Sequence, residues 1–148
     1  MLSMGRVPIR LLSVLAGTAA ALVVGAATVS ADEGYASWYG PGFQGNRMAN
    51  GQIFDQNDPT TTANNEYPMG TWLRVTNLKN RRTTFVRVND RGPVLEGRIV
   101  DLSAAAARAV GLAGVGKVKL EAVRESDPEL AKALVAQVQM PAPFPLGR

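Results

Sequence analysis

The stretch that decides the fold runs from Val86 to Gly111 and reads VRVNDRGPVLEGRIVDLSAAAARAVG. Its first valines alternate with polar residues, which is the pattern of a strand with one buried face. The run Asn-Asp-Arg-Gly-Pro that follows favours a tight turn. Residues 98–100 then predict a second short strand. The stretch therefore predicts two strands joined by a loop that carries polar side chains.

Two helices are predicted, one directly after the second strand and one near the end of the chain. Ser103 can cap an alanine-rich helix over residues 104–110. Ser126 can cap the later helix, with Pro128 in its first turn and Val135 near its end. Three prolines beyond that helix forbid its continuation, so a Pro-rich tail is expected.

The rest of the chain predicts further short strands separated by turns. The six strands are expected at Tyr35–Tyr39, Thr60–Thr62, Trp72–Leu78, Thr83–Asn89, Arg98–Val100 and Lys117–Val123. The Gly-, Asn- and Pro-rich segment 41–58 predicts a long ordered loop with at most a short strand at 53–54, and such loops are often functional. Six short strands with one inserted helix favour a small closed barrel, because closure leaves no exposed strand edge.

The composition limits the available chemistry. The chain has 148 residues, no cysteine and no histidine, which excludes thiol nucleophiles, His-based triads and the usual zinc sites. We expect no metal and no cofactor. Basic residues are scattered, with no stripe of Lys and Arg, so no nucleic-acid partner is expected. Acid–base chemistry must come from Asp, Glu, Lys or Tyr.

Residues 1–31 have the pattern of a secretory signal peptide. Arg6 and Arg10 precede a charge-free apolar run, and Val-Ser-Ala at 29–31 offers the small-x-small exit of signal peptidase. An uncleaved anchor helix is the alternative and would be the only membrane contact, since the run approaches the ~20 residues that span a bilayer. No cysteine follows the run, so the protein is not expected to be a lipoprotein. We expect a secreted or cell-envelope protein that begins at Asp32 and carries a net charge of +2.

Three segments in series carry a family resemblance. They read ASWYGPGFQGNRMANGQIFD (36–55), YPMGTWLRVTNL (67–78) and the stretch 86–111 quoted above, and GKVKLEAV follows as the last strand. Together they resemble the rare lipoprotein A (RlpA-like) family of double-psi β-barrels over roughly residues 34–125.

The resemblance implies a mainly β fold, a six-stranded double-psi β-barrel with one short inserted helix and a C-terminal helix and tail. The expected division is a signal peptide at 1–31, the RlpA-like barrel domain at 32–126, and a short helix with a Pro-rich tail at 127–148. We expect residues 127–148 to be dispensable for the barrel, because the last alternating strand ends near Val123.

The family resemblance also implies an activity and two catalytic residues. Several members are septal lytic transglycosylases, which cleave the MurNAc–GlcNAc bond of peptidoglycan glycan strands and leave 1,6-anhydro products. One carboxyl can do this if it first donates a proton and then accepts one, and a poorly hydrated site keeps it protonated. The resemblance assigns these roles to Asp90 and Asp101. In the alternative, purely structural roles, Asp90 bonds turn amides or pairs with Arg87 or Arg91, and Asp101 caps the alanine-rich helix in place of Ser103.

Substrate contacts are expected from amides, aromatic rings and one guanidinium group. The six candidates are Asn50, Gln52, Asn64, Tyr39, Tyr67 and Arg91. Gln52 and Asn64 stand where the family has Glu and His, so they keep hydrogen bonding and lose proton exchange. Neighbouring Gly and Pro favour exposure of the two tyrosines, whereas Trp38, Phe54 and Phe85 are expected in the core.

Two other functions stay open. A non-catalytic, expansin-like protein that binds cell-wall glycan needs only a groove, and a small protease-inhibitor-like module needs a rigid exposed loop. A transglycosylase needs a carboxyl that is protonated near neutral pH. We expect a monomer whose partner is the glycan strand of peptidoglycan.

Overall fold

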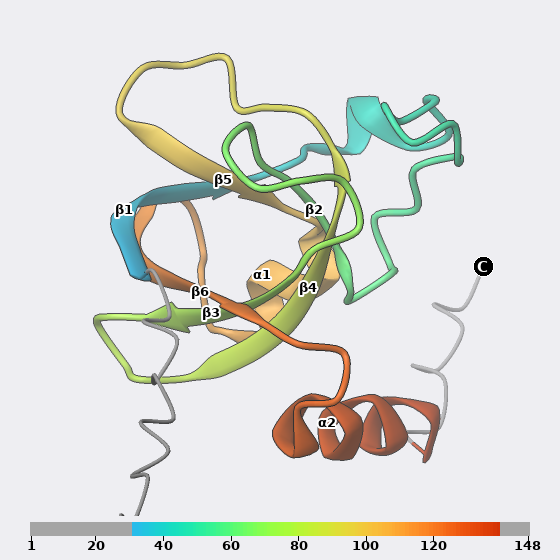
Figure 1. The fold of residues 1–148 in the computed structure, drawn as a ribbon. Helices are drawn as coiled ribbons and strands as arrows, with labels where there is room; N and C mark the ends of the chain where they lie inside the picture. Colours follow the sequence, from blue (N-terminus) through green and yellow to red (C-terminus); the bar gives the residue numbers. More distant parts are fainter. Residues whose placement is uncertain (1–30, 140–148) are drawn as a thin grey trace, which may run out of the picture.

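The computed structural model describes residues 31–139, so the predicted signal segment up to residue 30 and the Pro-rich end from residue 140 lie outside it. Six strands close into a barrel in the order β1-β5-β2-β4-β3-β6, as Figure 1 shows. The strands are β1 (Ala31–Trp38), β2 (Thr61–Ala63), β3 (Trp72–Asn77), β4 (Thr83–Asp90), β5 (Arg98–Leu102) and β6 (Gly116–Val123). The helices are η1 (Pro41–Phe43), α1 (Ala104–Ala109) and α2 (Pro128–Gln139). The predicted closed, six-stranded, mainly β fold is confirmed.

The pairing of the strands mixes two parallel with four antiparallel ladders. β1 runs parallel to β5, and β2 runs parallel to β4, while the other neighbours are antiparallel. β1 begins four residues earlier than the sequence predicts, because its first residues pair with β6 from Ala31 opposite Glu121 onward. The short strand expected at residues 53–54 is a single bridge between Arg47 and Ile53.

Aliphatic side chains fill the barrel. Five strands and α1 contribute buried residues to one cluster, which includes Leu73, Val86, Val100, Leu102, Val118 and Leu120, all without exposed surface. Burying one Val or Leu side chain contributes roughly 1.5–3 kcal/mol, so this cluster is the main source of stability. A second, smaller cluster of Tyr39, Met48, Phe54 and Ala63 lies under the loop 41–58.

The helix α2 lies against β4. Leu130 is 1% exposed, although it belongs to neither core cluster. Asp127 caps the helix in place of the predicted Ser126, because its carboxylate accepts hydrogen bonds from the N–H groups of Glu129 (2.9 Å) and Leu130 (3.2 Å). The helix also extends four residues past the predicted end at Val135.

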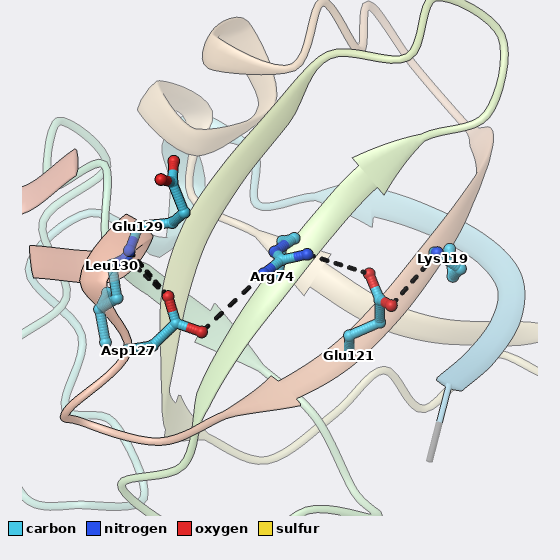
Figure 2. A network of polar contacts seen from close by, with 6 residues as sticks. All are labelled: Arg74, Lys119, Glu121, Asp127, Glu129 and Leu130. Atoms are coloured by element: carbon cyan, nitrogen blue, oxygen red, sulfur yellow. Dashed lines mark hydrogen bonds and ion pairs between the residues drawn. The ribbon is translucent and has the colours of Figure 1, made fainter. Parts of the chain in front are cut away.

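A line of charges ties α2 to the barrel surface, as Figure 2 shows. Arg74 lies 3.9 Å from both Asp127 and Glu121, and Glu121 lies 3.2 Å from Lys119. Surface ion pairs contribute about 0–1 kcal/mol each. Leu130 is therefore the contact that decides how firmly α2 is held, and the dispensability of residues 127–148 stays a prediction.

Candidate active site

The barrel topology brings the two predicted aspartates to the same place. β2 is hydrogen-bonded to β4 on one side and to β5 on the other. Its last residue, Ala63, is the register partner of Asp90 in β4 and of Asp101 in β5. The two aspartates are eleven positions apart in the chain, yet a single buried residue separates them across the sheet.

Asp101 projects into a pocket with one carboxylate oxygen held by the protein. Ser37 is its register partner in β1, and the Ser37 hydroxyl donates a short hydrogen bond to Asp101 Oδ1. Arg98 donates in turn to the Ser37 hydroxyl over 3.1 Å. Within residues 31–139, Asp101 Oδ2 accepts no hydrogen bond from the protein. Asp101 therefore has an oxygen available to a ligand.

The pocket in front of Asp101 has a volume of about 330 Å³. Apart from Ser37, Arg98 and Asp101, its walls are mostly apolar and include Trp38, Tyr39, Phe43, Arg91, Val94 and Leu95. Gly92 crosses directly over the carboxylate: its φ is +138°, and a Cβ there would lie 3.8 Å from Asp101 Oδ2. Glycine suits this crossing, since other residues rarely adopt that backbone conformation.

Both carboxylate oxygens of Asp90 accept hydrogen bonds from the protein. Its Oδ1 accepts the N–H groups of Ala49 (2.9 Å) and Arg91 (2.8 Å), and its Oδ2 accepts the Tyr39 hydroxyl (3.0 Å). Burial raises the pKa of Tyr39 well above its usual value, and the charges of Asp90 and Asp101 raise it further. The phenol thus stays protonated and donates to Asp90.

These contacts separate the two alternatives left open for each aspartate. Asp90 bonds turn amides, as the structural alternative expects, and it does not line the pocket. Asp101 does not cap α1, because Ser103 does: its hydroxyl accepts the N–H of Ala106 over 3.0 Å. The carboxylate that faces open space is Asp101.

Asn50 and Gln52 lie in a separate, more polar pocket of about 300 Å³. Both are exposed, and the Asn50 amide donates to Gln52 Oε1 over 2.7 Å. Asn89 and Arg87 line the same pocket. Asp90 lies between the two pockets, since its carboxylate binds Tyr39 of the first and the backbone beside Asn50 of the second.

Asn64 is not placed to bind a sugar, which corrects the sequence-based expectation. The side chain is 1% exposed. Its Nδ2 donates to the Ile99 carbonyl over 2.9 Å, and its Oδ1 accepts the N–H groups of Glu66 (2.8 Å) and Tyr67 (2.7 Å). All of its hydrogen bonds therefore shape the loop after β2.

The expected exposure of Tyr39 is wrong, because the loop 41–58 folds back over it. Its ring is 9% exposed and packs 4.7 Å, between centroids, from Phe54. Phe54 and Phe85 are buried, as predicted, whereas Trp38 is half-buried and packs against the core while lining the pocket. Tyr39 still lines the pocket, although little of it is exposed.

Tyr67 and Arg91 support the walls of the site. Tyr67 is half-buried, and its hydroxyl donates to Asp32 over 2.5 Å. Burial and Asp32 raise the pKa of Tyr67 to about 12. Arg91 Nη1 donates to the carbonyls of Asn64 (2.9 Å) and Tyr67 (2.7 Å), which fixes its guanidinium group beside the pocket.

Several residues that line the pocket are not among the site residues predicted from the sequence. Ser37 reaches Asp101 from the neighbouring strand β1, and Arg98, three residues before Asp101 in β5, bonds Ser37. The pairing of β1 with β5 that joins them leaves no periodic signal in the chain. Val94 (98% exposed) and Leu95 (57%) stand at the rim, in the loop after the tight turn. Two apolar residues in an otherwise polar loop are the signal that could have indicated them.

Proteins whose sequences are similar to this chain carry the names of peptidoglycan transglycosylases. The relatives include a probable endolytic peptidoglycan transglycosylase RlpA from Synechocystis sp., 55% identical over 62% of this chain and 29% of that protein. The endolytic peptidoglycan transglycosylase RlpA of Campylobacter jejuni is 48% identical over 62% of this chain and 34% of that protein. The chain therefore spans about a third of the length of these curated relatives.

Two solved structures have a similar fold. A Streptomyces papain inhibitor has a TM-score of 0.52 at 25% identity, covering 66% of this chain and 98% of that one. A Clavibacter michiganensis expansin has a TM-score of 0.51 at 29% identity, covering 66% of this chain and 52% of that one. The family model described as Lytic transglycolase matches residues 31–122, which is the double-psi β-barrel except for the last residue of β6. The chain belongs to the Lytic transglycolase family.

Proposed function

We propose that the protein is a lytic transglycosylase that cleaves peptidoglycan glycan strands, with Asp101 as its general acid and base. The observation that carries the proposal is the Asp101 carboxylate, which has one oxygen bonded to Ser37 and the other facing a largely apolar pocket. The RlpA relatives, named for endolytic cleavage of peptidoglycan, support this substrate class.

One carboxyl completes the reaction without water. Asp101 donates its proton to the glycosidic oxygen, and the bond between that oxygen and the anomeric carbon breaks. The C6 hydroxyl of the same sugar attacks the anomeric carbon, forms the 1,6-anhydro ring and returns its proton to Asp101. The carboxyl ends as it began, so no second acid is required.

Asp90 acts as a positioning residue in this scheme. It holds three donors that belong to different segments: Ala49 in the long loop, Arg91 after β4, and Tyr39 after β1. Tyr39 and Arg91 line the Asp101 pocket, and Ala49 directly precedes Asn50 of the second pocket. The catalytic role first assigned to both aspartates is therefore proposed for Asp101 alone.

The same proposal places the protein outside the cytoplasm, where peptidoglycan lies. Its support is the signal-like sequence of residues 1–31. N-terminal sequencing of the protein from the cell envelope and the medium tests it: a chain that begins at Asp32 is expected, and a full-length chain found only in membranes would contradict it.

Mass spectrometry of digested sacculi tests the activity. Wild-type protein should release 1,6-anhydro products, and Asp101→Asn should lower the rate by about 10²–10⁴, which is the usual contribution of general acid–base catalysis. The exposed Asp55 lies outside both pockets, so Asp55→Asn serves as the matched control. Sacculi that bind the wild-type protein without yielding anhydro products would favour the glycan-binding alternative instead.

A further inference from the structure

Arg98 is a half-buried cation in the pocket with no acidic partner in the described part of the chain. No Asp or Glu oxygen lies within 4.0 Å of its guanidinium group, and the four ion pairs of residues 31–139 involve other residues. Its side-chain hydrogen bond goes to the Ser37 hydroxyl (3.1 Å), which is neutral. A guanidinium group has five N–H donors in a planar fork, so most of them remain free.

Arg91 brings a second positive charge to the same pocket. Its Nη1 is bound by two backbone carbonyls, which orient the group without neutralising it. Asp101 is the sole acid among the lining residues, so two guanidinium groups face one carboxyl. When Asp101 is protonated, as cleavage requires, both charges lack a counterion. Arg98 is half-buried beside the apolar walls of the pocket, which strengthens its attraction for an anion, whereas Arg91 is exposed.

We propose that this pocket binds a carboxylate of the substrate, with Arg98 as its main ligand and Arg91 as a supporting charge. A carboxylate matches the planar fork of a guanidinium group, and such paired hydrogen bonds are short and directional. The pocket volume of about 330 Å³ accommodates a sugar ring with an acidic substituent.

This inference rests on the proposed function, because peptidoglycan supplies the carboxylate. Muramic acid carries a lactyl carboxylate when no stem peptide is attached, and stem peptides carry carboxylates of their own. Both groups start from C3 of the sugar whose anomeric carbon is attacked. Arg98 therefore binds the substrate at the ring that reacts, which favours glycan with acidic substituents over neutral glycan.

Binding of three soluble glycan hexasaccharides tests the inference by isothermal titration calorimetry. The first has free lactyl carboxylates, the second has the same groups converted to methyl amides, and the third has intact stem peptides. Wild-type protein should bind at least one acidic glycan about tenfold or more tightly than the amide, as expected for a charged hydrogen bond. The preferred acidic glycan identifies the source of the carboxylate.

Substitutions of arginine assign the effect to a residue. Arg98→Gln should abolish the preference for acidic glycan, and Arg98→Lys should keep part of it, because the charge remains and the fork is lost. Arg108→Gln is the matched control: Arg108 lines a different pocket of similar volume, and its replacement changes the net charge equally. Thermal melts verify that each variant is folded before binding is compared.

The outcomes separate this inference from the proposed function. The inference is overturned if wild-type protein binds the acidic and amide glycans equally or binds neither. It is also overturned if Arg98→Gln keeps the wild-type preference for acidic glycan. Anhydro products with no carboxylate preference leave the proposed function intact and reject the inference. A preference that Arg98→Gln abolishes, without anhydro products, supports the carboxylate site and rejects the transglycosylase.

Discussion

Tyr39→Phe removes one hydroxyl and leaves Asp90 Oδ2 without its protein donor. A hydrogen bond to a charged group contributes about 1.5–3 kcal/mol. Asp90 is half-buried, so water can replace part of the lost bond, and we expect a loss near 1.5 kcal/mol in the free energy of unfolding. For a domain of this size, that loss corresponds to a fall in Tm of roughly 5–9 °C at pH 7.

The raised pKa of Tyr39 also predicts how the free energy of unfolding changes with pH. The pKa of Tyr39 is raised in the folded state, whereas in the unfolded chain it returns to about 10. Below pH 10 the phenol is neutral in both states, and its full contribution to stability is present. Above pH 10 the unfolded state loses the proton first, so stability falls with pH by at most about 1.4 kcal/mol per unit for this residue.

Thermal melts followed by circular dichroism between pH 6 and 11 measure both effects. Wild type should lose stability steeply above pH 10, and Tyr39→Phe should start lower but show a shallower decline. Tyr67→Phe is a comparison of the same sign: its raised pKa of about 12 predicts a loss of stability over pH 10–12 as well, and its hydroxyl bonds Asp32 at an exposed position, where water can replace the lost bond. Melting curves that coincide for wild type and Tyr39→Phe would refute the reasoning.

Three further predictions concern α2, the loop after β2 and the pocket. Leu130→Ala should lower the free energy of unfolding, measured in urea, by about 2 kcal/mol, since three buried carbons are lost. Val138 is 86% exposed, so Val138→Ala should change that free energy by less than about 0.5 kcal/mol. Equal effects of the two substitutions would mean that α2 is not packed on the barrel. Asn64→Ala should lower the same free energy of unfolding by about 2–3 kcal/mol, because three buried hydrogen bonds are lost. Unfolding of the variant at the same urea concentration as wild type would contradict the buried placement of Asn64. Ser37→Ala should lower kcat on glycan roughly tenfold with little change in KM, because Ser37 holds the Asp101 carboxylate; an unchanged kcat would show that the contact is dispensable.

The strands were predictable because their burial follows the side-chain period of two. β3 and β4 keep Leu73, Val75, Val86 and Val88 inward, and the sequence shows this alternation directly. The cap of α2 was missed by one position, because Ser126 and Asp127 are both good capping residues and only geometry separates them. Local chemistry therefore placed the elements and left their ends uncertain by a few residues.

The family resemblance singled out Asp90 and Asp101, and their catalytic roles stay a prediction. Their surroundings could not be predicted from local sequence. Ser37 lies sixty-four positions from Asp101, and only the parallel pairing of β1 with β5 joins them. Tyr39 was misjudged for the same reason: what covers its ring is Phe54, from a loop whose path local sequence does not specify.

The shared register partner of the two aspartates has a consequence for how this barrel tolerates changes of length. β2 pairs with β4 and with β5, so the spacing of the two aspartate backbones across Ala63 follows from these pairings, including the irregularity in the β2–β4 register between Thr62 and Ala63. Insertions in the loops 41–58 or 91–97 can reshape the pocket rim without disturbing that spacing. A single residue inserted into β2 would turn its following side chains to the opposite face. The pocket rim of this protein can therefore change in length without moving the two aspartate backbones, whereas β2 cannot gain a residue without reversing its remaining side chains.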